Sequence, residues 1–174
     1  MRFLEAKFLS MGQRPDIVGL IADLAGGKVD FVICGGVACV LLGVERVTLD
    51  LDIRVPEDED NFRRLVRVLS GRGMVSRIPE PMESLCDPSR REAWVREKGA
   101  VAWTAQAPDG IEQVDVFLDY PIAWEDLLRD ARTISVCGFE ARVSSREHLI
   151  AAKRRVSPPR RKDLRDIEDL EALA

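Results

Sequence analysis

Residues 31–53 read FVICGGVACVLLGVERVTLDLDI, and this stretch contains most of the information about the fold. The short apolar run over 30–34 is typical of a buried strand. The Gly35-Gly36 pair then predicts a turn, and the apolar residues over 37–42 predict a short helix. A second strand follows, so the stretch predicts a strand–helix–strand unit with a glycine turn at the start of its helix.

The second strand, predicted over 49–55, places two carboxylates on one face. Asp50 and Asp52 are two residues apart, whereas Leu51 and Ile53 point to the opposite, buried face. Two carboxylates held this close repel each other unless a cation or a proton lies between them. Since Mg²⁺ binds through one or two carboxylates together with phosphates and waters, the pair is a candidate Mg²⁺ or Mn²⁺ site.

A third carboxylate is expected on a later strand, because two-metal sites hold both ions between several ligands. Asp115 is the candidate, since it alternates with Val114 and Val116 in a strand predicted over 112–118. Asp119, on the same face, is the second choice. The competing interpretation is a solvated strand face, because an Asp-x-Asp pair also occurs by chance.

The Gly35-Gly36 turn is a candidate phosphate site. Backbone N–H groups at the N-terminus of a helix lack partners within the helix and attract anions. The pair does not match the G-x-G-x-x-G pattern of dinucleotide-binding folds. Together with the two aspartates, the turn favours metal-assisted chemistry on a nucleotide.

The remaining sequence predicts an α/β protein. A Pro-Asp-Gly turn joins two of the expected strands, and Gly138 lies in the turn of a short hairpin. The expected elements are helices over 14–26, around 62–69, over 81–98 with a break near Asp87-Pro88, and over 122–130, and strands over 100–105, 112–118, 133–137 and 139–143.

Two further helices are predicted after the hairpin. Ser144 and Glu147 fit a capping box at the start of the first helix, and Pro158-Pro159 ends it. Residues 153–162 contain six basic residues in ten, which suits either an RNA backbone or a triphosphate, or else a solvated turn. The second helix is expected to bury an apolar face that consists of Leu164, Ile167, Leu170 and Leu173.

Composition limits the class of protein. The 174 residues suffice for one domain over 1–174, with a core over 28–143 and a helical pair over 144–173. Hydrophobic residues make up 46% and the net charge is −4, which is ordinary for a globular chain. No apolar run reaches the ~20 residues of a membrane span, and charges at the N-terminus oppose a signal peptide, so we expect a cytoplasmic protein. One histidine and four cysteines without a C-x-x-C pair argue against a structural zinc site.

The order of Gly35-Gly36, Asp50, Asp52 and Asp115 resembles the nucleotidyltransferase superfamily typified by DNA polymerase beta and kanamycin nucleotidyltransferase. The spacing Arg46-x-Thr48-x-Asp50-x-Asp52 is more similar to the abortive-infection AbiEii-like toxin nucleotidyltransferases. Their later signature is a Glu, then a Lys on a helix, then a basic residue with Asp-x-x-Asp on the next helix. The matching segments here are 147–153 and 162–167.

This resemblance, over about residues 28–173, implies a mixed β-sheet with helices mainly on one face and a C-terminal helical pair. It implies transfer of a nucleoside monophosphate from a nucleoside triphosphate to a hydroxyl, with Mg²⁺ or Mn²⁺. The acceptor is left open between an RNA end such as tRNA, a small molecule and a protein, and an antitoxin protein is a possible partner. The implied catalytic and metal-binding residues are Asp50, Asp52 and Asp115, and the implied nucleotide-binding residues are Gly35, Gly36, Arg46 and Lys153.

Four residues leave alternatives open. Arg46 either positions a phosphate or braces the aspartate strand. Gly36 stands where many relatives have Ser, which favours the alternative of a non-catalytic nucleotide-binding or interaction module that retains the fold. For Asp163 and Asp166, organising Lys153 and the neighbouring arginines is favoured over binding metal.

Overall fold

The structure is a computed structural model that describes residues 15–173. The expected start of the first helix, at residue 14, lies outside this range. The chain forms one mixed sheet with the strand order β3-β4-β5-β2-β1-β7-β6. The strands are β1 (Val32–Ile33), β2 (Asp50–Arg54), β3 (Val75–Ser76), β4 (Ala102–Gln106), β5 (Gln113–Phe117), β6 (Arg132–Val136) and β7 (Phe139–Val143).

The centre of the sheet determines where the site lies. β2 pairs in parallel with β5, and β1 pairs in parallel with β7, while the other neighbouring strands are antiparallel. This confirms the predicted mixed sheet. The two-residue strand β3 at one edge was not predicted, because two residues are too few to show alternation.

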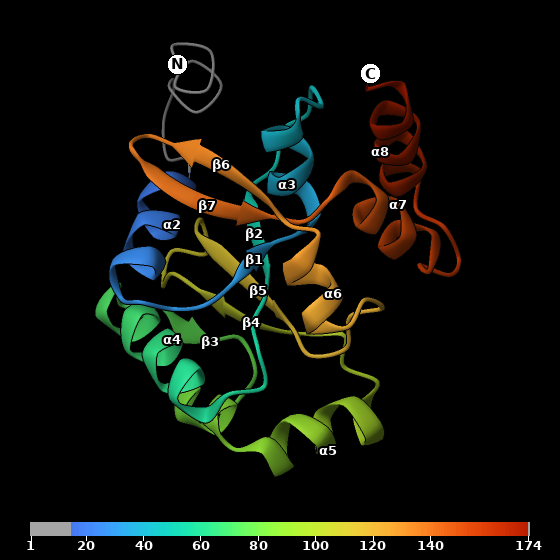
Figure 1. Ribbon diagram of the computed structural model, residues 1–174. Coiled ribbons are helices and arrows are strands. Elements are labelled where there is room, and N and C mark those ends of the chain that lie inside the picture. The colour runs from blue at the N-terminus through green and yellow to red at the C-terminus, as the bar shows by residue number, and fades with distance from the viewer. Residues whose placement is uncertain (1–14, 174) are drawn as a thin grey trace.

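The helices surround the sheet unequally. They are α2 (Ile17–Gly26), α3 (Gly35–Leu42), α4 (Glu59–Gly71), the 3₁₀-helix η1 (Met82–Cys86), α5 (Pro88–Lys98), α6 (Trp124–Arg129), α7 (Arg146–Arg154) and α8 (Arg161–Ala172). Figure 1 shows α2 and α4 side by side next to the sheet, and α7 with α8 as a pair at the other side of the molecule. No helix within residues 15–173 is long and apolar enough to cross a membrane.

The sheet buries one face much more than the other. Leu51, Ile53 and Val116 belong to the main hydrophobic core, which also contains the apolar faces of α2 and α4. On the opposite face a small cluster forms around Val32 and Leu127, the latter from α6. Because the strands alternate, the polar residues of β2 and β5 lie on this less covered face.

The C-terminal pair corrects two sequence-based expectations. Ser145, not Ser144, caps α7, because the backbone N–H of Ser144 still donates to Ile33 as an extension of the β1–β7 pairing. The Ser145 hydroxyl accepts from His148, so the predicted capping box with Glu147 does not form.

The apolar face predicted for α8 is also only partly correct. Leu164 is 47% exposed, while Leu170 is buried. The most buried positions of the first two turns of α8 are instead Asp163 and Asp166. The helix is therefore rotated so that two carboxylates face the rest of the protein.

Candidate active site

The structure brings Asp50, Asp52 and Asp115 together at the middle of the sheet. β2 and β5 are parallel neighbours whose register places Asp52 directly opposite Asp115. Ligand oxygens from the three carboxylates all lie within 4.8 Å of one another. Asp119 lies beyond the end of β5 and is not part of this group. The three carboxylates, called the triad below, have the donor type that Mg²⁺ and Mn²⁺ prefer.

The triad is electrostatically unfavourable without a cation. Burial, followed by the charges of Asp50 and Asp115, raises the pKa of Asp52 from 3.8 to about 7. The backbone N–H of Gly36 donates to Asp52 at 3.3 Å, which opposes the shift only in part. A bound divalent cation removes this repulsion, so the residues present fit such an ion.

Neighbouring side chains orient two of the triad carboxylates. The Thr48 hydroxyl donates to Asp50 at 3.0 Å. The Thr104 hydroxyl donates to one oxygen of Asp115 at 2.5 Å, and the Gln113 side-chain amide donates to the other at 3.0 Å. Our sequence reasoning missed these supporting residues. Strand alternation could have indicated Thr48 and Gln113. Each precedes a triad residue by two positions and therefore points to the same face of its strand.

The glycine turn touches the triad directly. Gly35 has φ +55°, and a Cβ there would lie 1.9 Å from a carboxylate oxygen of Asp52. A Cβ on Gly36 would lie 2.5 Å from the Thr48 hydroxyl and 3.1 Å from the Arg46 guanidinium. Gly35 therefore requires glycine, whereas a side chain at position 36 would need Thr48 and Arg46 to move. Helix α3 starts at Gly35, two residues earlier than predicted. The N-cap residue Cys34 makes no side-chain hydrogen bond to α3, and the Gly36 N–H in the first turn donates to Asp52, so the start of this helix already faces a negative charge.

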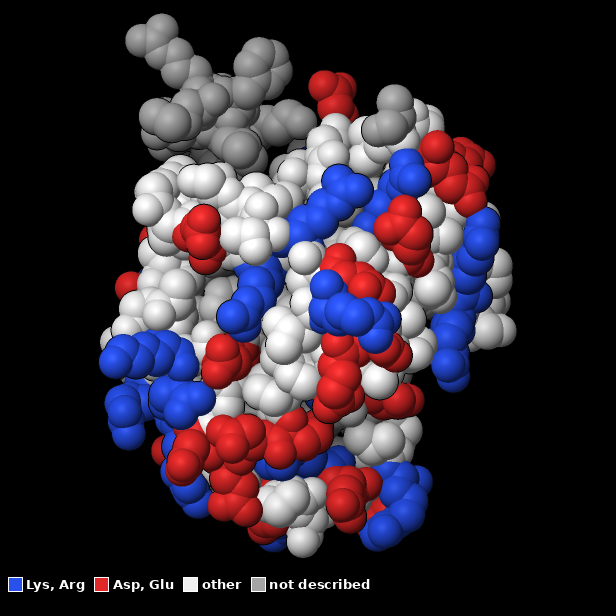
Figure 2. Space-filling model, in the orientation of Figure 1, with Lys and Arg blue, Asp and Glu red and all other residues white. Residues whose placement is uncertain are grey.

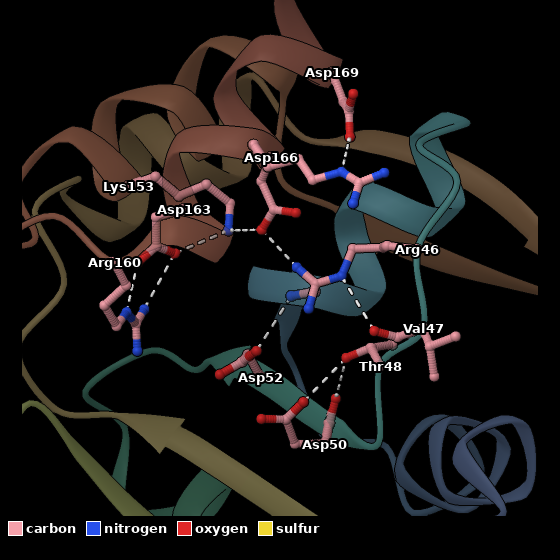
Figure 3. A network of polar contacts seen from close by, with 12 residues as sticks. Arg46, Val47, Thr48, Asp50, Asp52, Lys153, Arg160, Asp163, Asp166 and Asp169 are labelled. Carbon is pink, nitrogen blue, oxygen red and sulfur yellow. Dashed lines mark hydrogen bonds and ion pairs between the residues drawn. The ribbon is translucent and has the colours of Figure 1, made fainter.

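A network of ion pairs forms the other side of the site (Figure 3). The Lys153 ammonium lies 2.6 Å from Asp166 and 3.5 Å from Asp163. The same oxygen of Asp166 accepts from Arg46 at 2.5 Å, and Arg160 pairs with Asp163. Asp163 and Asp166 thus organise Lys153 and the arginines, as predicted. The ion pair of Arg46 joins it to α8, and not to the aspartate strand that the bracing interpretation named.

Each buried carboxylate of this network has two cationic partners. The side chains of Lys153 and Asp166 are 10% and 6% exposed. Burial alone would raise the pKa of Asp163, but the hydrogen bond from Arg160 and the charge of Lys153 hold this pKa below its usual range. Figure 2 shows the same mixture on the visible surface, where Lys and Arg side chains are interleaved with Asp and Glu. We see no large basic face in this view.

A cavity of about 580 Å³ connects the triad, the glycine turn and the ion-pair network. Its lining contains the triad carboxylates of Asp50, Asp52 and Asp115. The lining also includes apolar side chains, namely Phe117, Tyr120, Pro121, Leu149, Ala152 and Val156, and further charged ones, namely Asp119, Arg155, Arg160, Lys162 and Asp163. Such a cavity has both the charged and the apolar surface that a nucleotide needs.

The topology and the triad together define a nucleotidyltransferase-type fold. The lincosamide antibiotic adenylyltransferase LnuA, solved with lincomycin, superposes with a TM-score of 0.63 at 13% identity, covering 94% of this chain and 100% of that one. A nucleotidyltransferase-like protein of Paracoccidioides brasiliensis gives 0.56 at 21% identity over 91% of this chain and 74% of that one. The antibiotic-resistance factor ANT(2'')-Ia gives 0.55 at 17% identity over 88% and 81%.

No protein-family model matches the sequence, and the search of curated proteins found no match. At 13–21% identity, the structural likeness establishes the fold. Function has to be argued from the residues of the site.

Proposed function

We propose that this chain is a metal-dependent nucleotidyltransferase, which transfers a nucleoside monophosphate from a nucleoside triphosphate to a hydroxyl and releases pyrophosphate. The triad carries the proposal, because three converging carboxylates next to the N-terminus of α3 suit a divalent cation and a phosphate chain. The fold shared with LnuA and ANT(2'')-Ia supports it.

In this proposal each part of the site has a separate task. Asp50 and Asp52 would bind the metal ions, and the backbone N–H groups at Gly35 and Gly36 would hold the terminal phosphates. Mg²⁺ or Mn²⁺ supplies charge neutralisation on the phosphates when bound. Asp115, oriented by Thr104 and Gln113, would bind the metal that activates the acceptor hydroxyl and would also serve as the base.

The transfer itself forms one bond and breaks one. The acceptor oxygen attacks the α-phosphorus, the bond from this phosphorus to the β-bridging oxygen breaks, and pyrophosphate leaves. The hydroxyl proton leaves toward Asp115. Rate acceleration comes from positioning and charge neutralisation, as in other phosphoryl transfers.

The test is transfer of a labelled nucleotide. The protein is incubated with Mg²⁺, each labelled nucleoside triphosphate in turn, and pools of tRNA, aminoglycosides and lincosamides. We expect label in one acceptor pool and none with Asp50→Asn or Asp52→Asn. Asp119→Asn is the matched control, since Asp119 lines the same cavity outside the triad. Transfer that survives the triad substitutions contradicts the proposal.

One observation favours a second candidate, a non-catalytic nucleotide-binding module. Lys153 and Arg46, the side chains assigned to phosphate, are already paired with Asp166. Calorimetry with a triphosphate and Mg²⁺ separates the two candidates, because the module binds nucleotide without turnover.

Within the superfamily, the Arg46-x-Thr48-x-Asp50-x-Asp52 spacing supports placement in the AbiEii-like group. If the chain belongs to that group, we propose that it acts as a toxin and has an antitoxin protein as its partner. It is tested by whether expression arrests growth and whether the product of the adjacent gene relieves the arrest.

A further inference from the structure

We propose that Arg54 is a positioning residue, which holds one part of the cavity lining in place next to the triad strands. The part that it holds is residues 117–121, called the cavity segment below. The cavity is lined by four residues of this segment, Phe117, Asp119, Tyr120 and Pro121. Arg54 is not among the described residues that line the cavity, so it acts through the segment. The inference rests on the proposed function, since its expected consequence is weaker nucleotide binding.

Arg54 joins the two triad strands beyond the point where their pairing ends. It follows Asp52 by two residues and leaves the same face of β2. The parallel register of β2 and β5 ends with the pair of Ile53 and Val116. One position further along, the Nη1 group of Arg54 donates to the backbone carbonyl of Phe117 at 3.0 Å. The side chain therefore continues the connection between the strands at the residue where the cavity segment begins.

A chain of contacts fixes the Arg54 guanidinium. Its Nη1 group also donates to one oxygen of Glu57 at 3.1 Å, and the other oxygen of Glu57 accepts from Arg91 at 3.1 and 3.2 Å. The Arg91 side chain is 7% exposed, donates to the carbonyl of Leu85 and lies 3.9 Å from the centroid of the Phe62 ring. Leu85 and Phe62 belong to the main hydrophobic core. Arg54 is thus anchored to this core through Glu57 and Arg91.

The cavity segment has little regular structure of its own. β5 ends at Phe117, and the next element of the chain is α6. The N–H groups of Leu118 and Asp119 both donate to the carbonyl of Val101, which connects the segment to the side of β4. Arg54 supplies a connection on the opposite side, toward β2. Without Arg54 the first connection remains and the second is lost, so the segment can move away from the triad strands.

The experiment separates nucleotide binding from metal binding. Calorimetry with Mg²⁺ and each of ATP, GTP, CTP and UTP measures nucleotide affinity on the full chain, and electron paramagnetic resonance measures Mn²⁺ affinity without nucleotide. Arg54→Met should weaken nucleotide binding about tenfold, as expected for the loss of one hydrogen bond from a charged donor. The Mn²⁺ affinity should stay unchanged, because the triad keeps its own hydrogen bonds.

Two further variants separate positioning from folding. Arg54→Lys keeps one nitrogen that can donate to both Phe117 and Glu57, since Nη1 alone makes both contacts in the wild type. This variant should restore most of the nucleotide affinity. Arg142→Met is the control for the loss of an arginine from a strand, because Arg142 lies on β7 and its side chain is 47% exposed. It should bind nucleotide and Mn²⁺ like the wild type.

Hydrogen exchange followed by NMR tests the positioning without a nucleotide. In Arg54→Met the amides of Leu118 and Asp119 should exchange faster than in the wild type, because the segment opens more often. The amides of Val114 and Val116 should exchange at the wild-type rate, since β5 remains paired with β4.

Each outcome decides one of the two proposals. Unchanged exchange at Leu118 and Asp119 in Arg54→Met overturns the inference, and so does a nucleotide affinity equal to that of the wild type. Equal weakening of Mn²⁺ and nucleotide binding, or no rescue by Arg54→Lys, also overturns it, because Arg54 would then support the fold in general. A wild-type chain that binds no nucleotide overturns the proposed function, while the exchange rates still decide whether Arg54 holds the segment.

Discussion

The two halves of the site handle charge in opposite ways. The strand half, with Asp50, Asp52 and Asp115, gathers like charges that raise the pKa of Asp52. The helix half matches each buried carboxylate with a cation, as Asp166 does with Lys153 and Arg46. The carboxylates of the strand half are stabilised only when a cation binds. The carboxylates of the helix half already have cationic partners within the protein. Removing one carboxylate should therefore have opposite effects on the stability of the two halves.

The largest effect is expected in the helix half. Asp166→Asn leaves the buried ammonium of Lys153 and the guanidinium of Arg46 without their shared carboxylate, and should lower the free energy of unfolding by about 3 kcal/mol. Chemical denaturation measures this change. Asp169→Asn is the control on the same helix, because Asp169 pairs with an Arg165 side chain that is 80% exposed. Equal free energies of unfolding for Asp166→Asn and Asp169→Asn would contradict the predicted difference between the two halves.

The next effect concerns metal binding by the strand half. Asp52→Asn removes a ligand and should weaken Mn²⁺ binding by about 100-fold or more, since loss of outer-shell partners alone weakens metal affinity about 10- to 100-fold. Titration followed by electron paramagnetic resonance gives the affinity. Asp119→Asn should bind Mn²⁺ like the wild type. Equal affinities for Asp52→Asn and the wild type would show that the triad is not a metal site.

The pH dependence of stability should reveal the repulsion in the strand half. The folded pKa of Asp52, about 7, exceeds its unfolded value of 3.8, so the folded chain holds more protons between these values. Unfolding then releases a proton, and this group's contribution falls as pH rises from about 4 to about 7, by about 1 kcal/mol per pH unit.

The measurement compares metal-free wild type with Asp52→Asn by thermal unfolding between pH 5 and 8. We expect the variant to become the more stable of the two at the upper end, and saturating Mg²⁺ to restore the wild type. A stability difference that does not change with pH rules out a raised pKa at Asp52.

The smallest effect tests the support of the triad. Thr48→Val removes the hydroxyl that donates to Asp50 and keeps the side-chain shape, so Mn²⁺ binding should weaken about tenfold. Thr48→Ser should bind like the wild type. Thr133→Val, on the exposed strand β6, is the control for a generic loss of a hydroxyl. If Thr48→Val binds Mn²⁺ normally, the hydroxyl does not position the carboxylate.

The strand half was largely predictable from sequence. Strict alternation over 49–55 placed Asp50 and Asp52 on one face, and alternation around Asp115 nominated the third carboxylate. What sequence did not supply was the parallel pairing of β2 with β5, which joins distant segments. Thr104 shows the same limit, because its contact with Asp115 depends on the register between β4 and β5.

The helix half was less predictable. Apolar periodicity assigned Leu164 to the buried face of α8, but the buried ion pairs of Asp163 and Asp166 rotate the helix away from that orientation. Hydrophobic pattern alone misassigns a helix whose buried face contains paired charges. The prediction that Ser144 caps α7 was wrong for a related reason, since its backbone N–H donates to Ile33 in the sheet.

The bridge between Arg46 and Asp166 joins residues 120 positions apart. During synthesis the N-terminal part of a chain emerges first, so the triad strands are available before α8 has left the ribosome. Until α8 packs, Lys153 and Arg46 have no carboxylate partner from it. In a nascent chain the site therefore lacks Asp163 and Asp166. The ion-pair network forms only after α8 has been synthesised.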